Sequence, residues 1–473
     1  MRYGQRNSDP SRTLHPGGQT ARATARAPAA GGTGHIFPAV LLTVQALILI
    51  VPQGLDYSQQ VAAGVGSALP TEGDAITEFI WISLLLGGLY LLIRNRSRTL
   101  PLLKHFNPYI VAFLGLAALS IFWSIEPAVT LRRVYRFVTV LVVSLAFTVQ
   151  GWHRRRYQNV ARTLLTMILI ASIIFVLIAP QYAVQAQLVS ELKGAWRGIT
   201  EGKNNLGPLA SDAVILWLHA WLSKESKPAT AASGFLMSLF VLIKTRSDDS
   251  ILATAFGVPF MLLLLRPAGS LRRYMPYIVT LFAVAIGVYA LAVLNLIPGS
   301  ATLLSPIALL TGKSLTFSNR TTIWAVLEMH IRLHPWLGTG YGAYWYDTPG
   351  SPSQEMVRYL YFYPTEGHNG YLDVINDTGY VGFCILIAYF ISYFRQSLYL
   401  MRRDKYQAGL YLTLIFTAFL SDLSESHWFN VLQIGFLLMT LATAALARSY
   451  LEARAGSTSA RRMKHARTTG ISR

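Results

Sequence analysis

The chain has 473 residues, of which 53% are hydrophobic and 13% are charged, and its formal net charge is +19. A soluble domain of this size would carry about a quarter charged residues, so the composition excludes an ordinary soluble fold. Lys and Arg cluster between apolar runs, which is the pattern that orients membrane proteins and argues against nucleic acid as a partner. The single cysteine, Cys384, excludes an intramolecular disulfide.

Both ends of the chain are polar. Residues 1–35 are rich in Ala, Gly, Arg and Thr and lack the apolar core of a cleavable signal peptide. We expect them to form a disordered cytoplasmic tail, and we expect the same of the basic residues 449–473.

Apolar runs long enough to approach the thickness of a bilayer recur between these tails, each flanked by charge. They predict an all-α polytopic membrane protein of about twelve spans, with spans one to nine in residues 36–297 and spans ten to twelve in 369–448. The runs cover residues 36–52, 76–93, 108–124, 133–149, 163–180, 205–222, 231–244, 250–265, 275–297, 379–394, 407–423 and 430–447.

The basic residues predict the orientation of these spans. With the amino terminus in the cytoplasm, the cytoplasmic segments hold 29 of the 41 Lys and Arg residues, and the outer segments hold the remaining 12. Cytoplasmic loops are normally enriched in this way, so we expect both termini in the cytoplasm of a bacterium and the spans in its inner membrane. The cytoplasmic runs include Arg94, Arg96, Arg98, Arg154, Arg155, Arg156, Arg266, Arg272, Arg273, Arg402, Arg403 and Lys405.

The longest loop, residues 298–368, is then periplasmic. It contains a helical pattern at 319–333 and many aromatic residues, and it is too hydrophobic for a linker. We expect it to fold back on the bundle and to roof a cavity.

Several basic residues lie on the outer side, against the topology rule. Each one can reach water or pair locally, because a long side chain at the membrane boundary snorkels. As a set, they favour a cavity for an anion such as a lipid phosphate or diphosphate, since arginine binds phosphate bidentately. These residues are Arg132, Arg133, Arg136, Arg197, Lys203, Lys244, Arg246, Arg320, Arg332 and Arg358.

His368 and Asn369 stand where the long loop meets the tenth span, in Glu366-Gly-His-Asn-Gly-Tyr-Leu-Asp373. A histidine there can transfer a proton near neutral pH, or it can make ordinary hydrogen bonds. Nearby cations are expected to lower its pKa and keep it neutral. The glycines of Leu337-Gly-Thr-Gly-Tyr-Gly342 lack the context of a dinucleotide loop. No spacing in the sequence indicates a metal site, so we expect neither cofactor nor metal.

Four segments together resemble the O-antigen ligase and Wzy-type polymerase superfamily. They are Asn319-Arg-Thr-Thr-Ile-Trp324, His334-Pro-Trp-Leu-Gly-Thr-Gly-Tyr341, His368-Asn-Gly-Tyr-Leu372 and Gly379-Tyr-Val-Gly382. Thr245-Arg-Ser-Asp-Asp-Ser250 is similar to a degenerate form of the motif that opens the family's core region. Trp123-Ser-Ile-Glu-Pro127, followed by Thr130-Leu-Arg-Arg133, resembles the exopolysaccharide-polymerase branch.

The resemblance implies a metal-independent, inverting glycosyltransfer from undecaprenyl diphosphate on the periplasmic face of the membrane. It implies that His368 assists the acceptor hydroxyl and that Arg320 and Arg197 hold the diphosphate. The family also has an acidic residue at the outer end of span eleven, and the resemblance implies that Asp422 or Glu425 matches it. The further candidates for substrate binding are Arg133, Lys203, Arg246 and Asn369.

Three classes of function remain open. A polymerase joins lipid-linked repeat units, whereas a ligase moves the finished glycan to lipid A core or another acceptor by the same chemistry. A transporter is the third, but residues 36–222 and 231–447 show no internal repeat of the kind common in transporters. The expected partners are an undecaprenyl diphosphate-linked oligosaccharide and membrane lipids, with a chain-length regulator and a flippase as candidate protein partners.

Overall fold

The computed structural model describes residues 36–52, 55–57, 75–185, 194–266, 320–346, 352–356 and 364–468, with Leu360 and isolated residues between 272 and 284. This part of the chain is helical, and its one β-type contact is an isolated bridge between Val184 and Trp196. The predicted fold class is therefore confirmed, and the protein is an all-α polytopic membrane protein. Residues 1–35, the predicted amino-terminal tail, lie outside the described residues.

The helices follow the predicted runs closely. Eleven of the twelve runs overlap a helix, and the ninth, 275–297, lies almost wholly outside the described residues. The longer helices are α1 (Ile36–Ile50), α3 (Ala75–Arg94), α4 (Arg96–Leu103), α5 (Pro108–Leu119), α6 (Pro127–Val149), α7 (Arg156–Ile178), α9 (Lys203–Leu222), α10 (Pro228–Thr245), α11 (Asp248–Leu265), α14 (Arg320–Leu333), α16 (Gly370–Met401), α17 (Lys405–Ser421) and α18 (Ile434–Thr468).

Fewer helices than twelve qualify as membrane spans on length and hydropathy. Six described helices do so, namely α3, α7, α10, α11, α16 and the first part of α18. A seventh span is possible if α4 and the segment Pro108–Phe122, which are bent by 91° relative to each other, cross together. The count of about twelve therefore stays a prediction.

The carboxyl-terminal tail differs from the expectation of disorder. Residues 449–468 continue α18 as a helix, although their strong basic charge suggested an unstructured tail. Ala, Arg, Met and Leu are good helix formers, and the segment contains a single glycine, Gly456, so a helix already begun at Ile434 can propagate through it.

A break inside α16 fixes the second half of the long loop. Gly379 has φ +67°, and a Cβ there would lie 2.1 Å from the backbone of Trp336, so only glycine fits. The loop backbone takes over the hydrogen bonds that the break frees: Thr339 N donates to Asn376 O at 2.9 Å, and Tyr380 N donates to Pro335 O at 2.8 Å. This part of the loop folds back on the bundle, as expected.

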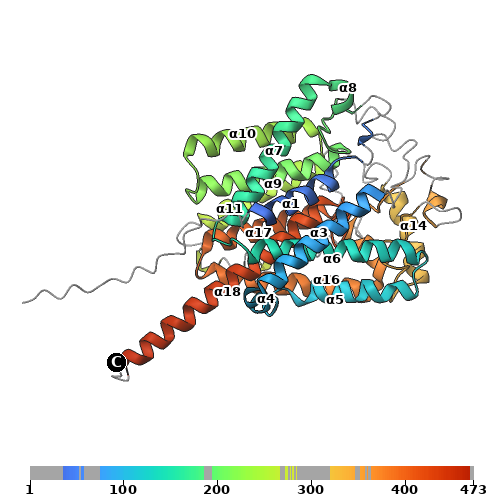
Figure 1. The fold of residues 1–473 in the computed structure, drawn as a ribbon. Coiled ribbons are helices and arrows are strands. Elements are labelled where there is room, and N and C mark those ends of the chain that lie inside the picture. The colour runs from blue at the N-terminus through green and yellow to red at the C-terminus, as the bar shows by residue number, and fades with distance from the viewer. Residues whose placement is uncertain are drawn as a thin grey trace, which may run out of the picture. The chain divides into compact units, whose positions relative to one another are not determined.

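The two ends of the bundle carry different contacts. At one end, Lys203 donates to the carbonyl of Arg246, and Arg320 pairs with Asp249. At the other end, Arg154 pairs with Asp404, and Lys405 donates to the carbonyl of Leu265. Figure 1 shows α14 at the first end, opposite the extension of α18. The helices therefore alternate in direction, as the predicted topology requires, while the side of the membrane that each end faces stays a prediction.

Candidate active site

The segment between the long loop and α16 is held rigidly around Gly367. The N–H of Gly367 donates to Asp373 Oδ2 at 3.0 Å, and its carbonyl accepts from Trp324 Nε1 at 2.9 Å. Asn369 caps α16, because its side chain accepts from the N–H groups of Tyr371 and Leu372. His368 lies between these two anchors with φ +48°, a backbone conformation that costs energy for a residue other than glycine.

The imidazole of His368 faces two carboxylates. Its Nδ1 lies 3.3 Å from Glu366 Oε1 and 3.7 Å from Glu425 Oε2, and 26% of the side chain remains exposed. The second oxygen of Glu366 accepts from Gln433 Nε2 at 2.8 Å. His368 is thus oriented from one edge of its ring, and the exposed part of the ring lies away from Nδ1.

Arg320, the first residue of α14, joins the same group of charges. Its guanidinium lies 2.9 Å from Glu425 Oε1 and 3.2 Å from Asp249 Oδ2, at the start of α11. Asn204, in the first turn of α9, also donates to Glu425 Oε1, at 2.8 Å. We call this group the carboxylate cluster: Glu366, Glu425, Asp249, His368 and Arg320.

The electrostatics of the cluster overturn the expectation of a neutral histidine. Burial of the ring and the Arg320 guanidinium lower the pKa of His368, but the carboxylates of Glu366 and Glu425 outweigh both and raise it to about 9. Burial raises the pKa of Glu425, whereas Arg320 and His368 bring it below its usual value. Near pH 7 the resting site therefore holds an imidazolium beside two ionised carboxylates.

Three side chains of the cluster have the spacing of a metal site, which the sequence did not reveal. The ligand atoms of Glu366, His368 and Glu425 lie within 4.8 Å of one another. A metal ion there would require the imidazolium to lose its proton and would share Glu425 with the guanidinium 2.9 Å away. Since Arg320 and His368 already balance these carboxylates, we assign the cluster to ion pairing.

Arg197 lies outside the cluster. Its side chain is buried and donates to the backbone carbonyls of Tyr182 at 2.7 Å, Glu201 at 3.5 Å and Tyr57. It thereby ties the loop before α9 to the segment after α1. Burial and the charge of Glu366 raise the pKa of the Glu201 carboxyl, whereas Arg197 lowers it, so Glu201 lies within electrostatic reach of both.

The other predicted residues divide into two groups. Asn369 and Asp422 shape the backbone: Asp422 Oδ1 accepts from the N–H groups of His427 and Trp428, which fixes the turn that carries Glu425. Of the two acidic candidates, Glu425 is therefore the one in the cluster. Lys203 donates to the carbonyl of Arg246 at 3.2 Å, and it directly precedes Asn204, which contacts Glu425.

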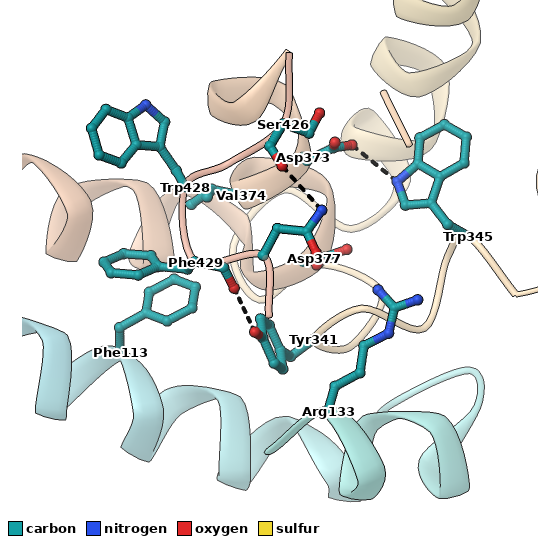
Figure 2. Close-up of a pocket in the computed structure, with 11 residues that line it drawn as sticks. Phe113, Arg133, Tyr341, Trp345, Asp373, Val374, Asp377, Ser426, Trp428 and Phe429 are labelled. Atoms are coloured by element: carbon teal, nitrogen blue, oxygen red, sulfur yellow. Dashed lines mark hydrogen bonds between the residues drawn. The ribbon is translucent and has the colours of Figure 1, made fainter. Parts of the chain in front are cut away.

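Arg133 lines a separate pocket, shown in Figure 2. The pocket has a volume of about 20 Å³, enough for a water molecule and too small for a sugar ring. Trp345 Nε1 donates to Asp373 Oδ1 on one side, and the N–H of Gly342 donates to Asp377 Oδ2 on the other. The outer arginines thus do not line one common cavity in the part of the chain that the structure describes.

Sequence reasoning gave no role to several residues that build the site. Asp249 lies inside a segment used for the family resemblance, and Glu366 and Asp373 are the ends of the segment singled out around His368, so a local signal was present for these three residues. Asn204 and Gln433 act through contacts between distant parts of the chain, which no local pattern indicates.

Comparisons with known proteins bear on this site. Residues 233–387 match the family model described as O-Antigen ligase, a range that contains Asp249, Arg320 and His368 but ends before Glu425. The chain is also 24% identical over 310 residues to "Exopolysaccharide production protein ExoQ" of Rhizobium meliloti (strain 1021), covering 63% of this chain and 67% of that protein. These matches confirm the predicted resemblance, first to O-antigen ligases as a class and then to ExoQ-like proteins in particular.

Proposed function

We propose that the protein is a membrane glycosyltransferase that polymerises exopolysaccharide. It transfers a glycan from undecaprenyl diphosphate to a hydroxyl of another lipid-linked repeat unit, with inversion and without a metal. The observation that supports this best is the carboxylate cluster, an imidazole beside two carboxylates and a largely buried guanidinium, of which all members except Glu425 lie inside the segment that matches O-antigen ligases.

The reaction needs a proton acceptor and a stabilised leaving group. The acceptor oxygen bonds to the anomeric carbon while its proton passes to the deprotonated ring of His368. The bond from the anomeric carbon to the diphosphate oxygen breaks, and the electron pair stays on the diphosphate. Arg320 stabilises this developing charge, since the planar guanidinium that contacts one oxygen of Asp249 and one of Glu425 also suits the oxygens of a phosphate.

Lys203 and Arg246 complete the diphosphate site in this proposal. The cluster itself holds three carboxylates against two cations, so it would repel a diphosphate that lay wholly inside it. The two basic residues lie close to it, because Lys203 donates to the carbonyl of Arg246 and is next in sequence to Asn204, which contacts Glu425. We therefore place the diphosphate beside the cluster, between these residues and Arg320, and the acceptor hydroxyl at His368.

We also propose that the cluster faces the periplasm and that both termini face the cytoplasm of the bacterial inner membrane. The split of 29 to 12 basic residues between the two sides supports this orientation. An accessible cysteine introduced at residue 350 of a Cys384→Ser variant should react with an impermeant thiol reagent in intact spheroplasts. Labelling that requires a breached membrane would overturn the orientation.

A ligase is the second candidate, because the matched family model is described as O-Antigen ligase. The two functions differ in the substrate that accumulates when the protein is missing. Mass analysis of lipid-linked glycans from a deletion strain should show single repeat units if the protein is a polymerase. Full-length polymers on lipid would support the ligase and contradict our proposal.

A further inference from the structure

Glu366 is the carboxylate best placed to act on His368. Its Oε1 is the nearer acidic oxygen, at 3.3 Å from Nδ1, compared with 3.7 Å for Glu425 Oε2. Glu425 also balances Arg320 and accepts from Asn204, so its negative charge is shared among three partners. The charge of Glu366 is directed mainly at the imidazole.

The position of Glu366 is fixed from several sides. Gln433 donates to its other oxygen at 2.8 Å, and its side chain is buried, with 8% of the residue exposed. The residue between Glu366 and His368 is Gly367, whose N–H and carbonyl are held by Asp373 and Trp324. The carboxylate and the imidazole are therefore presented as one preorganised unit.

The geometry points to Glu366 as a positioning residue, which pairs with the Nδ1 edge of His368 and directs Nε2 of the same ring toward the acceptor hydroxyl. This inference rests on the proposed function. Nδ1 is buried whereas the ring as a whole is 26% exposed, so the accessible edge is the one that carries Nε2. A carboxylate behind an imidazole fixes its tautomer and stabilises the imidazolium that forms when Nε2 takes the proton.

A measurable pH dependence follows. With a pKa of about 9, His368 is mostly protonated at pH 7, so the rate should rise with pH through about pH 9, where half of the rings are neutral. Removing the charge of Glu366 favours the neutral ring, which moves this rise to lower pH. The charged groups around the ring are Glu366, Glu425, His427 and Arg320, with Asp249 behind Arg320 and Glu201 facing Glu366.

The test compares Glu366→Gln with the wild-type protein, using purified protein and lipid-linked repeat units. We expect the rising limb of kcat to shift by about one pH unit toward acid and the plateau to fall by about tenfold or more, with KM little changed. Glu366→Asp should restore the limb in part. The matched control is Glu328→Gln on the exposed side of α14, which should change neither quantity. An unshifted limb in Glu366→Gln would overturn the inference, because a purely structural role lowers the plateau alone.

A second measurement separates this inference from the proposed function. Diethyl pyrocarbonate modifies neutral imidazole, so the pH dependence of His368 modification, followed by mass spectrometry, reports its titration without any substrate. We expect a midpoint near pH 9 in the wild-type protein, as its pKa indicates, and a lower midpoint in Glu366→Gln. If Glu366→Gln fails to insert into the membrane, Gln433→Ala supplies a second test, because it removes the hydrogen bond to one oxygen of Glu366. This variant should still change the midpoint of His368 modification. A midpoint equal to that of the wild-type protein would refute the positioning role of Glu366. Absence of polymerisation together with the expected midpoints would refute only the proposed function.

Discussion

Arg197 and Arg320 are buried arginines at the same end of the bundle, but the first donates to backbone carbonyls and the second pairs with carboxylates. Carbonyls carry no net charge, so the contacts of Arg197 mainly fix the course of the chain. Carboxylates carry a full charge, so the contacts of Arg320 set the electrostatics of the cluster. The partners of a buried arginine, more than its burial, therefore indicate whether it acts on chemistry or on structure.

The largest effect is expected for Arg320→Ala. Its removal leaves Glu425 and Asp249 buried without their cation and removes charge stabilisation from the leaving group. We expect polymer formation to fall by at least about 10²-fold. Arg320→Lys should recover part of the rate, since lysine keeps the charge but loses the planar fork. Wild-type polymer levels in Arg320→Ala would show that the cluster is not the active site.

Arg197→Lys should affect the stability of the protein and not the reaction, in contrast to Arg320→Ala. Lysine cannot donate to three separated carbonyls from one planar group, and each buried carbonyl left without a donor costs about 1–3 kcal/mol. We expect a lower melting temperature in detergent and less inserted protein, with KM for the lipid-linked donor unchanged in the protein that remains. A large rise in KM at normal stability would instead assign Arg197 to the diphosphate, as the family resemblance implied.

A smaller effect, or none, is expected from chelation. Arg320 and the imidazolium of His368 already balance the carboxylates that have metal-site spacing, so activity should survive exhaustive dialysis against a chelator. Loss of activity that a divalent ion restores would show that Glu366, His368 and Glu425 bind a metal.

The sequence predicted the helical membrane fold because apolar runs and their flanking charges are local signals. It also located His368 and Arg320, which lie in recognisable motifs. It left Asp422 and Glu425 as alternatives, since the residue that joins the cluster depends on the turn that Asp422 shapes after α17.

The charges around His368 were predicted less well, because they also depend on contacts between distant parts of the chain. The outer arginines are visible in the sequence, and an arginine-lined cavity follows if they converge. In the structure Arg133 reaches a separate pocket and Arg197 reaches carbonyls, while Glu366 and Glu425, from two distant segments, face His368. Whether the charges around His368 raise or lower its pKa depends on how distant segments pack together, and no local sequence pattern indicates it.

The central claim is that His368 removes the proton of the acceptor hydroxyl, and the most direct measurement compares His368→Gln with His368→Ala. The assay is polymer formation from purified lipid-linked repeat units between pH 7 and pH 9, a range chosen because the pKa of His368 is about 9. Glutamine can orient a hydroxyl by a hydrogen bond but cannot accept its proton, so at pH 9 both variants should lose a factor on the order of 10² or more, and neither should show the rise in rate with pH that the wild-type protein shows. Near-normal turnover by His368→Gln would contradict the role as a base, and near-normal turnover by His368→Ala would remove this residue from the reaction.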